Sequence, residues 1–361
     1  MWPYWLLFLI PAYFAITRLR PIMPFPQNGR KGRWPIEWWG IFVLLILMIG
    51  LRHKVGGDWT AYINNLDDLA GGTLAEVLAT VDPAFAIIYW VAIKTGLGIY
   101  LVNVLSAAFF TWGLIIFCRA QPRPWLALAV AVPYLITVVA MGYTRQGVAI
   151  GVAMIGMVAL EQGSVLRFVF CIALAAAFHK SAVILVPLGI LANPQHRVRS
   201  VLVVAAASFA LFAVLLQNYL DYFQHGYLDD QYQSSGAAIR VIMNALPAAI
   251  FLIFRKRFNL TPSQKIFWTW MSWAALVFVV LLKLSPSSTA VDRVALYWIP
   301  VQLFVLSRLP NALGQRSDRN AVWVSAVVAY SAAVLFVWLV FADNATAWLP
   351  YQFYPVVWLW Q

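Results

Sequence analysis

The residues most able to do chemistry lie in one segment, which reads Arg52-His53-Lys54-Val55-Gly56-Gly57-Asp58-Trp59-Thr60-Ala61-Tyr62. Its two glycines free the backbone to turn and to approach a ligand closely. Asp58 is placed to cap the helix that should follow. Asp58, Tyr62 and Asn65 lie at positions i, i+4 and i+7, so they share one face of this helix. A carboxylate beside a phenol and an amide suits the binding or deprotonation of a sugar hydroxyl. A pure capping role is the alternative for Asp58, but it leaves the preceding cationic triplet unexplained.

Two further motifs place cations where apolar segments meet. Arg145 lies in Tyr143-Thr144-Arg145-Gln146-Gly147, where one apolar helix should end and the next begin. A helix N-terminus with a guanidinium group makes a site for phosphate, although a snorkelling arginine is the alternative. His179-Lys180-Ser181 interrupts another long apolar stretch. A tight turn there would present both cations to one pocket, and a plain helix-hairpin turn is the alternative.

The elements that carry these motifs follow from composition. Of 361 residues, 63% are hydrophobic and only 11% are charged, which is about half the charge of a soluble domain. There are too few polar residues to coat so large a core, so the chain is predicted to be an all-α, polytopic membrane protein. This excludes a soluble enzyme, a disordered chain and a disulfide scaffold. It also argues against a nucleic-acid partner as the reason for the net charge of +12, because membrane proteins place Lys and Arg on cytoplasmic loops.

About twelve spans are expected in one membrane domain, residues 1–361, with an outer loop at 52–82. They fall near 1–17, 37–51, 98–118, 125–142, 145–160, 165–178, 181–193, 200–217, 240–254, 265–283, 294–308 and 321–341. A shorter run at 83–96 is predicted to be a re-entrant or interfacial helix on the outer side. If it does not cross, most of the 25 Lys and Arg residues fall on inner loops, as the positive-inside rule requires. The aromatic stretch 348–361 then lies outside and is expected to anchor the chain at the interface.

The remaining basic residues lie on the outer side, against this topological bias, and need another explanation. They are mixed with most of the 13 acidic residues of the chain. An anionic ligand held at the outer bilayer surface would account for them.

Three stretches together resemble the EpsG-like family of bacterial polysaccharide polymerases, which is related to the Wzy-type polymerases. They are Arg52 to Tyr62, Tyr143 to Ala149 and Phe178-His179-Lys180-Ser181-Ala182, and Asp82-Pro83-Ala84-Phe85 fits a weaker fourth element. The resemblance spans about residues 40–300. Trp59 stands where the family usually has Tyr, and Asp82 stands where it usually has Glu.

The resemblance implies a repeat-unit polymerase of exopolysaccharide or O-antigen in the bacterial inner membrane, with a GT-C-like architecture. Its substrates would be undecaprenyl-pyrophosphate-linked oligosaccharides at the periplasmic face, and the growing glycan would pass to a lipid-linked acceptor. A flippase and a chain-length regulator are the partner proteins to expect, beside the lipid bilayer.

This reaction assigns roles to the outer residues. Departure of pyrophosphate needs positive charge, for which the candidates are Arg52, Arg145, Lys180, Arg240 and Arg293. The acceptor hydroxyl needs a base, with Asp58 as first choice and His179 as second. The glycan-binding candidates are Trp59, Tyr62, Asn65 and Gln146. No paired nucleophile is evident, so inversion by direct displacement is expected, and no cofactor is predicted.

Other functions remain open at this stage. A transporter or flippase of lipid-linked glycans should carry ionisable residues deep in its spans and show repeat symmetry. An acyltransferase with His179 as base would need a polar tunnel, and a glycan ligase shares the same leaving group. A cation site is a further alternative, for Asp221, His225, Asp229 and Asp230. Their spacing matches no known ligand pattern, so a solvated loop is favoured and no metal is predicted.

Overall fold

The computed structural model describes residues 1–19, 34–191, 197–211, 234, 236–314 and 320–359. Within these ranges every regular element is helical, and the extended backbone is limited to an isolated bridge between Arg52 and Phe353. The prediction of an all-α fold is confirmed for this part of the chain.

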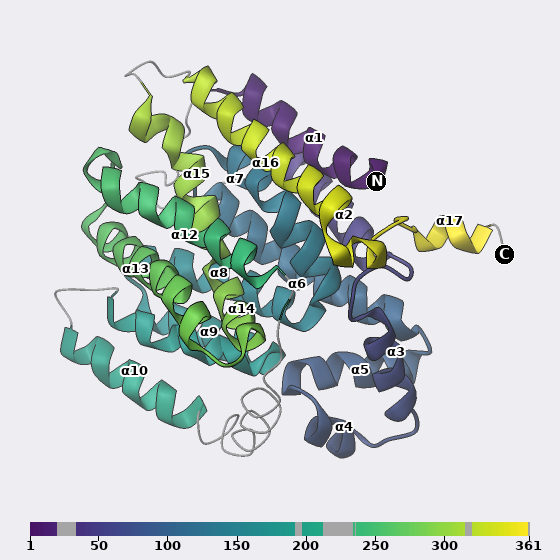
Figure 1. The fold of residues 1–361 in the computed structure, drawn as a ribbon. Helices are drawn as coiled ribbons and strands as arrows, with labels where there is room; N and C mark the ends of the chain where they lie inside the picture. Colours follow the sequence, from purple (N-terminus) through teal and green to yellow (C-terminus); the bar gives the residue numbers. More distant parts are fainter. Residues whose placement is uncertain (20–33, 192–196, 212–233, 235, 315–319, 360–361) are drawn as a thin grey trace.

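Figure 1 shows the helices coloured in chain order. The first half of the chain contains α1 (Trp2–Thr17), α2 (Ile36–Gly50), α3 (Trp59–Asp68), α4 (Leu74–Thr80), α5 (Pro83–Thr95), α6 (Gly98–Arg119), α7 (Pro124–Ala131), the π-helix η1 (Val132–Ala140) and α8 (Thr144–Glu161). The second half contains α9 (Val165–Phe178), η2 (Lys180–Leu191), α10 (Arg197–Leu211), α12 (Ala237–Phe254), η6 (Arg255–Arg257), α13 (Pro262–Leu284), α14 (Ser288–Ala295), η7 (Leu296–Trp298), α15 (Ile299–Leu313), α16 (Ala321–Phe341), η8 (Asp343–Ala347) and α17 (Tyr354–Leu359).

Several of these helices have the length and composition of membrane spans. Five described segments are long and apolar enough to cross a bilayer, namely α6, the run Ala237–Arg257, α13, the run Ser288–Leu313 and α16. Seven shorter apolar helices of 10 to 17 residues accompany them. The chain is a membrane protein, and the count of about twelve spans stays a prediction.

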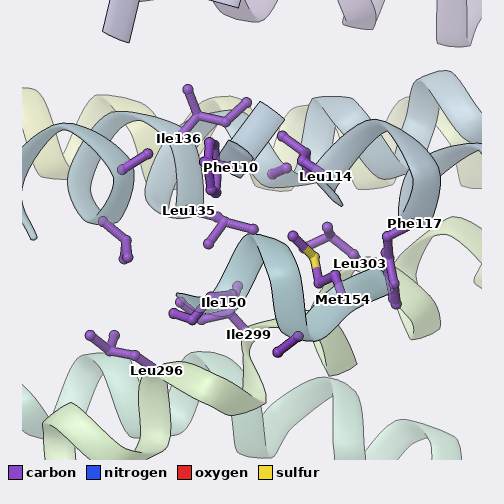
Figure 2. Packing of buried hydrophobic residues seen from close by; sticks show 14 of the residues in the cluster. Phe110, Leu114, Phe117, Leu135, Ile136, Ile150, Met154, Leu296, Ile299 and Leu303 are labelled. Carbon is purple, nitrogen blue, oxygen red and sulfur yellow. The ribbon is translucent and has the colours of Figure 1, made fainter. Parts of the chain in front are cut away.

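Helix α8 lies at the centre of the bundle and packs against α6 on one side and α9 on the other. Figure 2 shows Ile150 and Met154 of α8 among side chains of α6, η1 and α15. The α6–α8 contact depends on glycine, because a Cβ atom on Gly113 would lie 1.8 Å from the carbonyl oxygen of Gly151. Such small residues let helix backbones approach closely in membranes. The N-terminus of α8, which carries Arg145, is therefore fixed by a rigid core.

Helices α3, α4 and α5 form a small group at one end of the bundle (Figure 1). Helix α5 packs against α4, α6 and α9 and ends at Gly96, which has a left-handed backbone. Its bounds confirm the helix predicted at 83–96, while its position relative to the bilayer stays a prediction.

The C-terminal stretch differs from the interfacial anchor expected at 348–361. Trp348 is only 1% exposed, and its indole N–H donates to the carbonyl of Thr137 at 2.7 Å. The Tyr4 hydroxyl donates to the carbonyl of Trp348, also at 2.7 Å. Trp358, by contrast, is largely exposed. The anchor prediction is wrong for Trp348, because this indole finds a buried hydrogen-bond partner inside the bundle.

Candidate functional site

Arg52 anchors the loop that precedes α3. Its guanidinium donates to the carbonyl oxygens of Ile49 and Val55 and, at 2.8 Å, to the hydroxyl of Thr144. The residue is 1% exposed. These bonds join the C-terminus of α2 to the N-terminus of α8. The geometry gives Arg52 a positioning role, and its contact with pyrophosphate stays a prediction.

Gly56 seats the same loop directly on the residues that precede α8. It has a φ of +107°, and a Cβ atom there would lie 2.2 Å from the carbonyl oxygen of Met141. Its N–H donates to the carbonyl of Ala347 at 2.8 Å. The glycine is required both for its left-handed backbone and for this close approach. The loop is thus held between α8 and the C-terminal segment.

The C-terminal segment holds the loop from its other side. The N–H of His53 donates to the carbonyl of Gln352 at 2.9 Å, and the N–H of Tyr354 donates to the carbonyl of Leu51 at 2.8 Å. These bonds form the bridge beside Arg52. Residues distant in sequence therefore fix the position of the loop that ends at Asp58.

Asp58 occupies the N-cap position of α3, but its side chain makes no capping hydrogen bond. The guanidinium groups of Arg293, Arg145 and Arg52 act on this carboxylate electrostatically. Burial raises the pKa of Asp58, and the three positive charges oppose that rise. Because the carboxylate does not cap its own helix, the pure capping interpretation fails. Asp58 instead shares a site with the predicted cations.

Arg145 is surrounded by groups from three separate motifs. Its backbone N–H donates to the hydroxyl of Tyr62 at 3.2 Å. Its guanidinium Nη1 lies 3.5 Å from a carboxylate oxygen of Asp82. The N–H of Lys180 also donates to Asp82, whose pKa is raised by burial against these positive charges. Asp82 and the Tyr62 hydroxyl thus link Arg145 to α3 and to the start of η2.

Arg293 reaches the same region from α14. Its guanidinium lies 3.9 Å from the ring centroid of Tyr143, in a cation–π contact, and its backbone carbonyl accepts a hydrogen bond from the side chain of Gln146. No carboxylate of the described residues forms an ion pair with Arg293. Gln146 therefore positions Arg293, and its predicted glycan contact stays a prediction.

Arg240 is engaged differently. Its Nε and Nη2 donate to the two carboxylate oxygens of Asp292, each at 2.7 Å, and Nη2 also contacts Ser234. Both members of the pair are at most 8% exposed. A bidentate, buried pair of this kind fixes α12 to α14. The geometry makes Arg240 a structural residue, and its contact with pyrophosphate stays a prediction.

His179 connects α9 to η2 and belongs to a chain of hydroxyl groups. Its Nδ1 accepts from the backbone N–H of Ser181 at 3.4 Å and lies 2.8 Å from the Ser181 hydroxyl, which in turn lies 3.0 Å from the Tyr297 hydroxyl. A backbone N–H can only donate, so Nδ1 is unprotonated and the ring proton is on Nε2. Burial and the charges of Arg145 and Arg293 lower the pKa of His179 to about 3. The imidazole is therefore a neutral hydrogen-bond donor at pH 7.

The remaining glycan-binding candidates lie on α3. Trp59 is 8% exposed and packs against His53 and Tyr100. Asn65 is half-buried. Their predicted glycan contacts are not tested by this arrangement.

Three site residues were not among the sequence candidates: Asp82, Tyr143 and Tyr297. The Asp82-Pro83 pair at a helix start was a usable signal for the first. The sequence gives no such signal for Tyr143 or Tyr297, because an aromatic residue in an apolar segment is usually a packing residue.

Asp221, His225, Asp229 and Asp230, the alternative cation ligands, lie outside the described residues. Among the residues that are described, no group of three or more His, Cys, Asp and Glu is placed to hold a metal ion.

Comparison with known proteins identifies one family. The family model described as the EpsG family matches residues 38–353. No curated protein and no solved structure matches the chain. The matched range includes Asp58, Asp82, Arg145, Lys180 and Arg293. Since it covers most of the sequence, the chain belongs to the EpsG family.

Proposed function

We propose that the protein is a membrane glycosyltransferase that polymerises lipid-linked oligosaccharide units. It transfers a growing glycan from undecaprenyl pyrophosphate to the sugar of a lipid-linked acceptor. Membership of the EpsG family supports a role in polysaccharide polymerisation. The observation that carries the proposal is that the charges of Arg293 and Arg145, which lie on different helices, act on the carboxylate of Asp58.

The reaction needs two kinds of groups, and the site supplies both. The acceptor hydroxyl oxygen forms a bond to the anomeric carbon, while the bond from that carbon to the pyrophosphate oxygen breaks. The electron pair leaves with the pyrophosphate, where Arg145, Lys180 and Arg293 stabilise the developing negative charge. The proton of the hydroxyl passes to Asp58, and the anomeric carbon is inverted in this direct displacement.

Asp58 suits the role of base better than His179. A base works best when its pKa approaches the working pH, and burial moves the pKa of Asp58 in that direction. The pKa of His179 is lowered to about 3, and its Nδ1 already accepts hydrogen bonds. His179 instead donates through Nε2 to the phosphate or to a sugar oxygen.

The finer assignments belong to the same proposal. The bundle has about twelve spans and a GT-C-like architecture, and the site faces the periplasm across the bacterial inner membrane. The positive-inside rule supports this orientation, because it leaves most of the Lys and Arg residues on cytoplasmic loops. An anion held at the outer surface then explains the cations of the site, which lie against that bias. The product is an exopolysaccharide or an O-antigen, made together with a flippase and a chain-length regulator.

The test is polymerisation by the purified protein in proteoliposomes supplied with undecaprenyl-pyrophosphate-linked repeat units. The proposal predicts a ladder of products that differ by one repeat unit. Transfer of glycan to an acceptor other than a lipid-linked unit would indicate a ligase. Movement of the lipid-linked unit across the bilayer without new glycosidic bonds would indicate a transporter.

A further inference from the structure

Two arginine–aspartate pairs in this protein differ in geometry. Arg240 and Asp292 form a bidentate pair at 2.7 Å, with both side chains at most 8% exposed. Arg145 and Asp82 are separated by 3.5 Å, and the side chain of Arg145 is 36% exposed. The first pair has the geometry of a fixed structural contact. The second pair is longer, and part of its arginine side chain is exposed, so a ligand can reach the guanidinium of Arg145.

Asp82 does not cap the helix that it precedes. It is the N-cap of α5, directly before Pro83, yet its side chain makes no capping hydrogen bond. Its carboxylate turns instead toward Arg145 and the N–H of Lys180. A missing cap costs about 1 kcal/mol, which these contacts with Arg145 and Lys180 offset.

We propose, on the basis of the function proposed above, that Asp82 determines the specificity of the site for pyrophosphate esters over monophosphate esters. In the substrate-free protein its carboxylate occupies the anion position beside Arg145. An incoming phosphate must take that position from Asp82.

The selectivity follows from how many cations each ligand can reach. A monophosphate ester has one phosphate group, which competes with Asp82 directly and gains little by replacing it at Arg145. Lys180 and Arg293 act on His179 electrostatically together with Arg145, so the three charges belong to one region. A pyrophosphate ester has a second phosphate group that can engage Lys180 or Arg293 while the first contacts Arg145. Asp82 repels both ligands, but only the pyrophosphate gains a second cation contact that offsets this repulsion. The repulsion by Asp82 therefore makes the site specific for pyrophosphate.

The experiment compares farnesyl monophosphate and farnesyl pyrophosphate as inhibitors and as calorimetric ligands of the full-length protein. The variants are Asp82→Asn, Asp82→Glu and, as a control, Asp67→Asn, which neutralises an exposed acid on α3. Asp82→Asn should bind the monophosphate about tenfold more tightly, so that the preference for pyrophosphate shrinks by a similar factor. Asp82→Glu and Asp67→Asn should keep the wild-type preference.

Several outcomes would overturn the proposal. If Asp82→Asn lowers the affinity for the monophosphate and the pyrophosphate by the same factor, Asp82 only orients Arg145. If Asp82→Asn does not fold, a wild-type preference in a folded Asp82→Ser variant would also refute the role. If the wild type binds farnesyl pyrophosphate and Asp82→Asn keeps the wild-type preference for pyrophosphate over monophosphate, the role of Asp82 is refuted. The proposed function would then still stand. Failure of the wild-type protein to bind either ester would also remove the proposed function.

Discussion

The hydroxyl of Tyr62 accepts a hydrogen bond from the backbone N–H of Arg145 at 3.2 Å. This bond joins α3, the helix that follows the loop ending at Asp58, to the start of α8. It satisfies one of the free N–H groups at the N-terminus of α8 and places Asp58 and the guanidinium of Arg145 on the same site. This contact therefore links the proposed base and the proposed leaving-group cation, which come from two distant motifs.

Replacement of Arg145 should abolish most of the polymerisation. Arg145→Ala removes a guanidinium that stabilises the departing pyrophosphate, and we expect kcat to fall by about 10²–10³-fold. Arg145→Lys should restore little activity, because an ammonium group cannot grip a phosphate with two parallel N–H bonds. Initial rates of ladder formation measure both effects. Arg18→Ala, at an exposed ion pair with Glu37, is the control and should keep its rate. Full rescue by lysine would show that charge alone suffices.

Asp58→Asn should separate activity from stability. The variant lacks the base and should form no ladder, yet its melting temperature at neutral pH should equal or exceed that of the wild type. The reason is that burial raises the pKa of Asp58, so the ionised carboxylate destabilises the folded state above that pKa. Asp67→Asn should keep both properties. A large loss of melting temperature in Asp58→Asn would contradict this role.

The pH profile of the wild-type enzyme follows from the same shift. Because the base must be ionised, activity falls as the pH drops through the raised pKa of Asp58. The acidic limb should therefore lie at a higher pH than the ordinary aspartate pKa of about 3.9. Single-turnover rates between pH 4 and pH 8 locate this limb, and a limb at or below the ordinary value would exclude Asp58.

The sequence predicted that Arg145 and Lys180 lie at helix ends because each motif has a local cause. Arg145 follows a helix break, His179 and Lys180 interrupt an apolar stretch, and Gly56 and Gly57 allow a tight loop. These features place charges at helix ends, and helix ends of one face lie together in a bundle. The all-helical class followed from composition in the same direct way.

The sequence could not predict which cations find a protein partner. Arg52 donates to the carbonyls of Ile49 and Val55, and Arg240 pairs with Asp292, 52 residues away. The burial of Trp348 depends on Thr137, which is more distant still. Residue type and spacing carry no information about such contacts. For this reason the five outer cations appeared equivalent, whereas the structure separates positioning residues from those that face Asp58 and Asp82.

The loop conformation gives an independent test of how the site is built. Gly56→Ala introduces a Cβ atom 2.2 Å from the carbonyl of Met141 at a φ of +107°. We expect a loss of about 1–3 kcal/mol in the free energy of unfolding and a displaced Asp58, seen as a loss of activity. Gly40→Ala in α2 is the matched control, since nothing lies within 4 Å of its added Cβ, and it should be neutral or stabilising. Wild-type activity in Gly56→Ala would show that the loop does not position the base.

The ring nitrogen that His179 uses can be tested by amide substitutions. The side-chain nitrogen of Gln is placed like Nε2, and that of Asn is placed like Nδ1. Because Nε2 carries the donor proton, His179→Gln should retain about tenfold more activity than His179→Asn. Steady-state rates in proteoliposomes give the comparison, with thermal unfolding as the control for folding. A better rate for Asn would place the donor at the position of Nδ1 and refute the assignment. Loss of activity in both folded variants would instead support His179 as the base, because neither amide can accept the proton.

If a lipid pyrophosphate is the leaving group and the cations beside Asp58 stabilise it, each new glycosidic bond should release one undecaprenyl pyrophosphate. The decisive measurement counts the lipid pyrophosphate released for each bond in the wild type, in Arg145→Ala and in Arg293→Ala. We expect one released lipid pyrophosphate per bond in the wild type and a slow release in both variants. Bonds that form without this release, or release at the wild-type rate in both variants, would contradict this expectation.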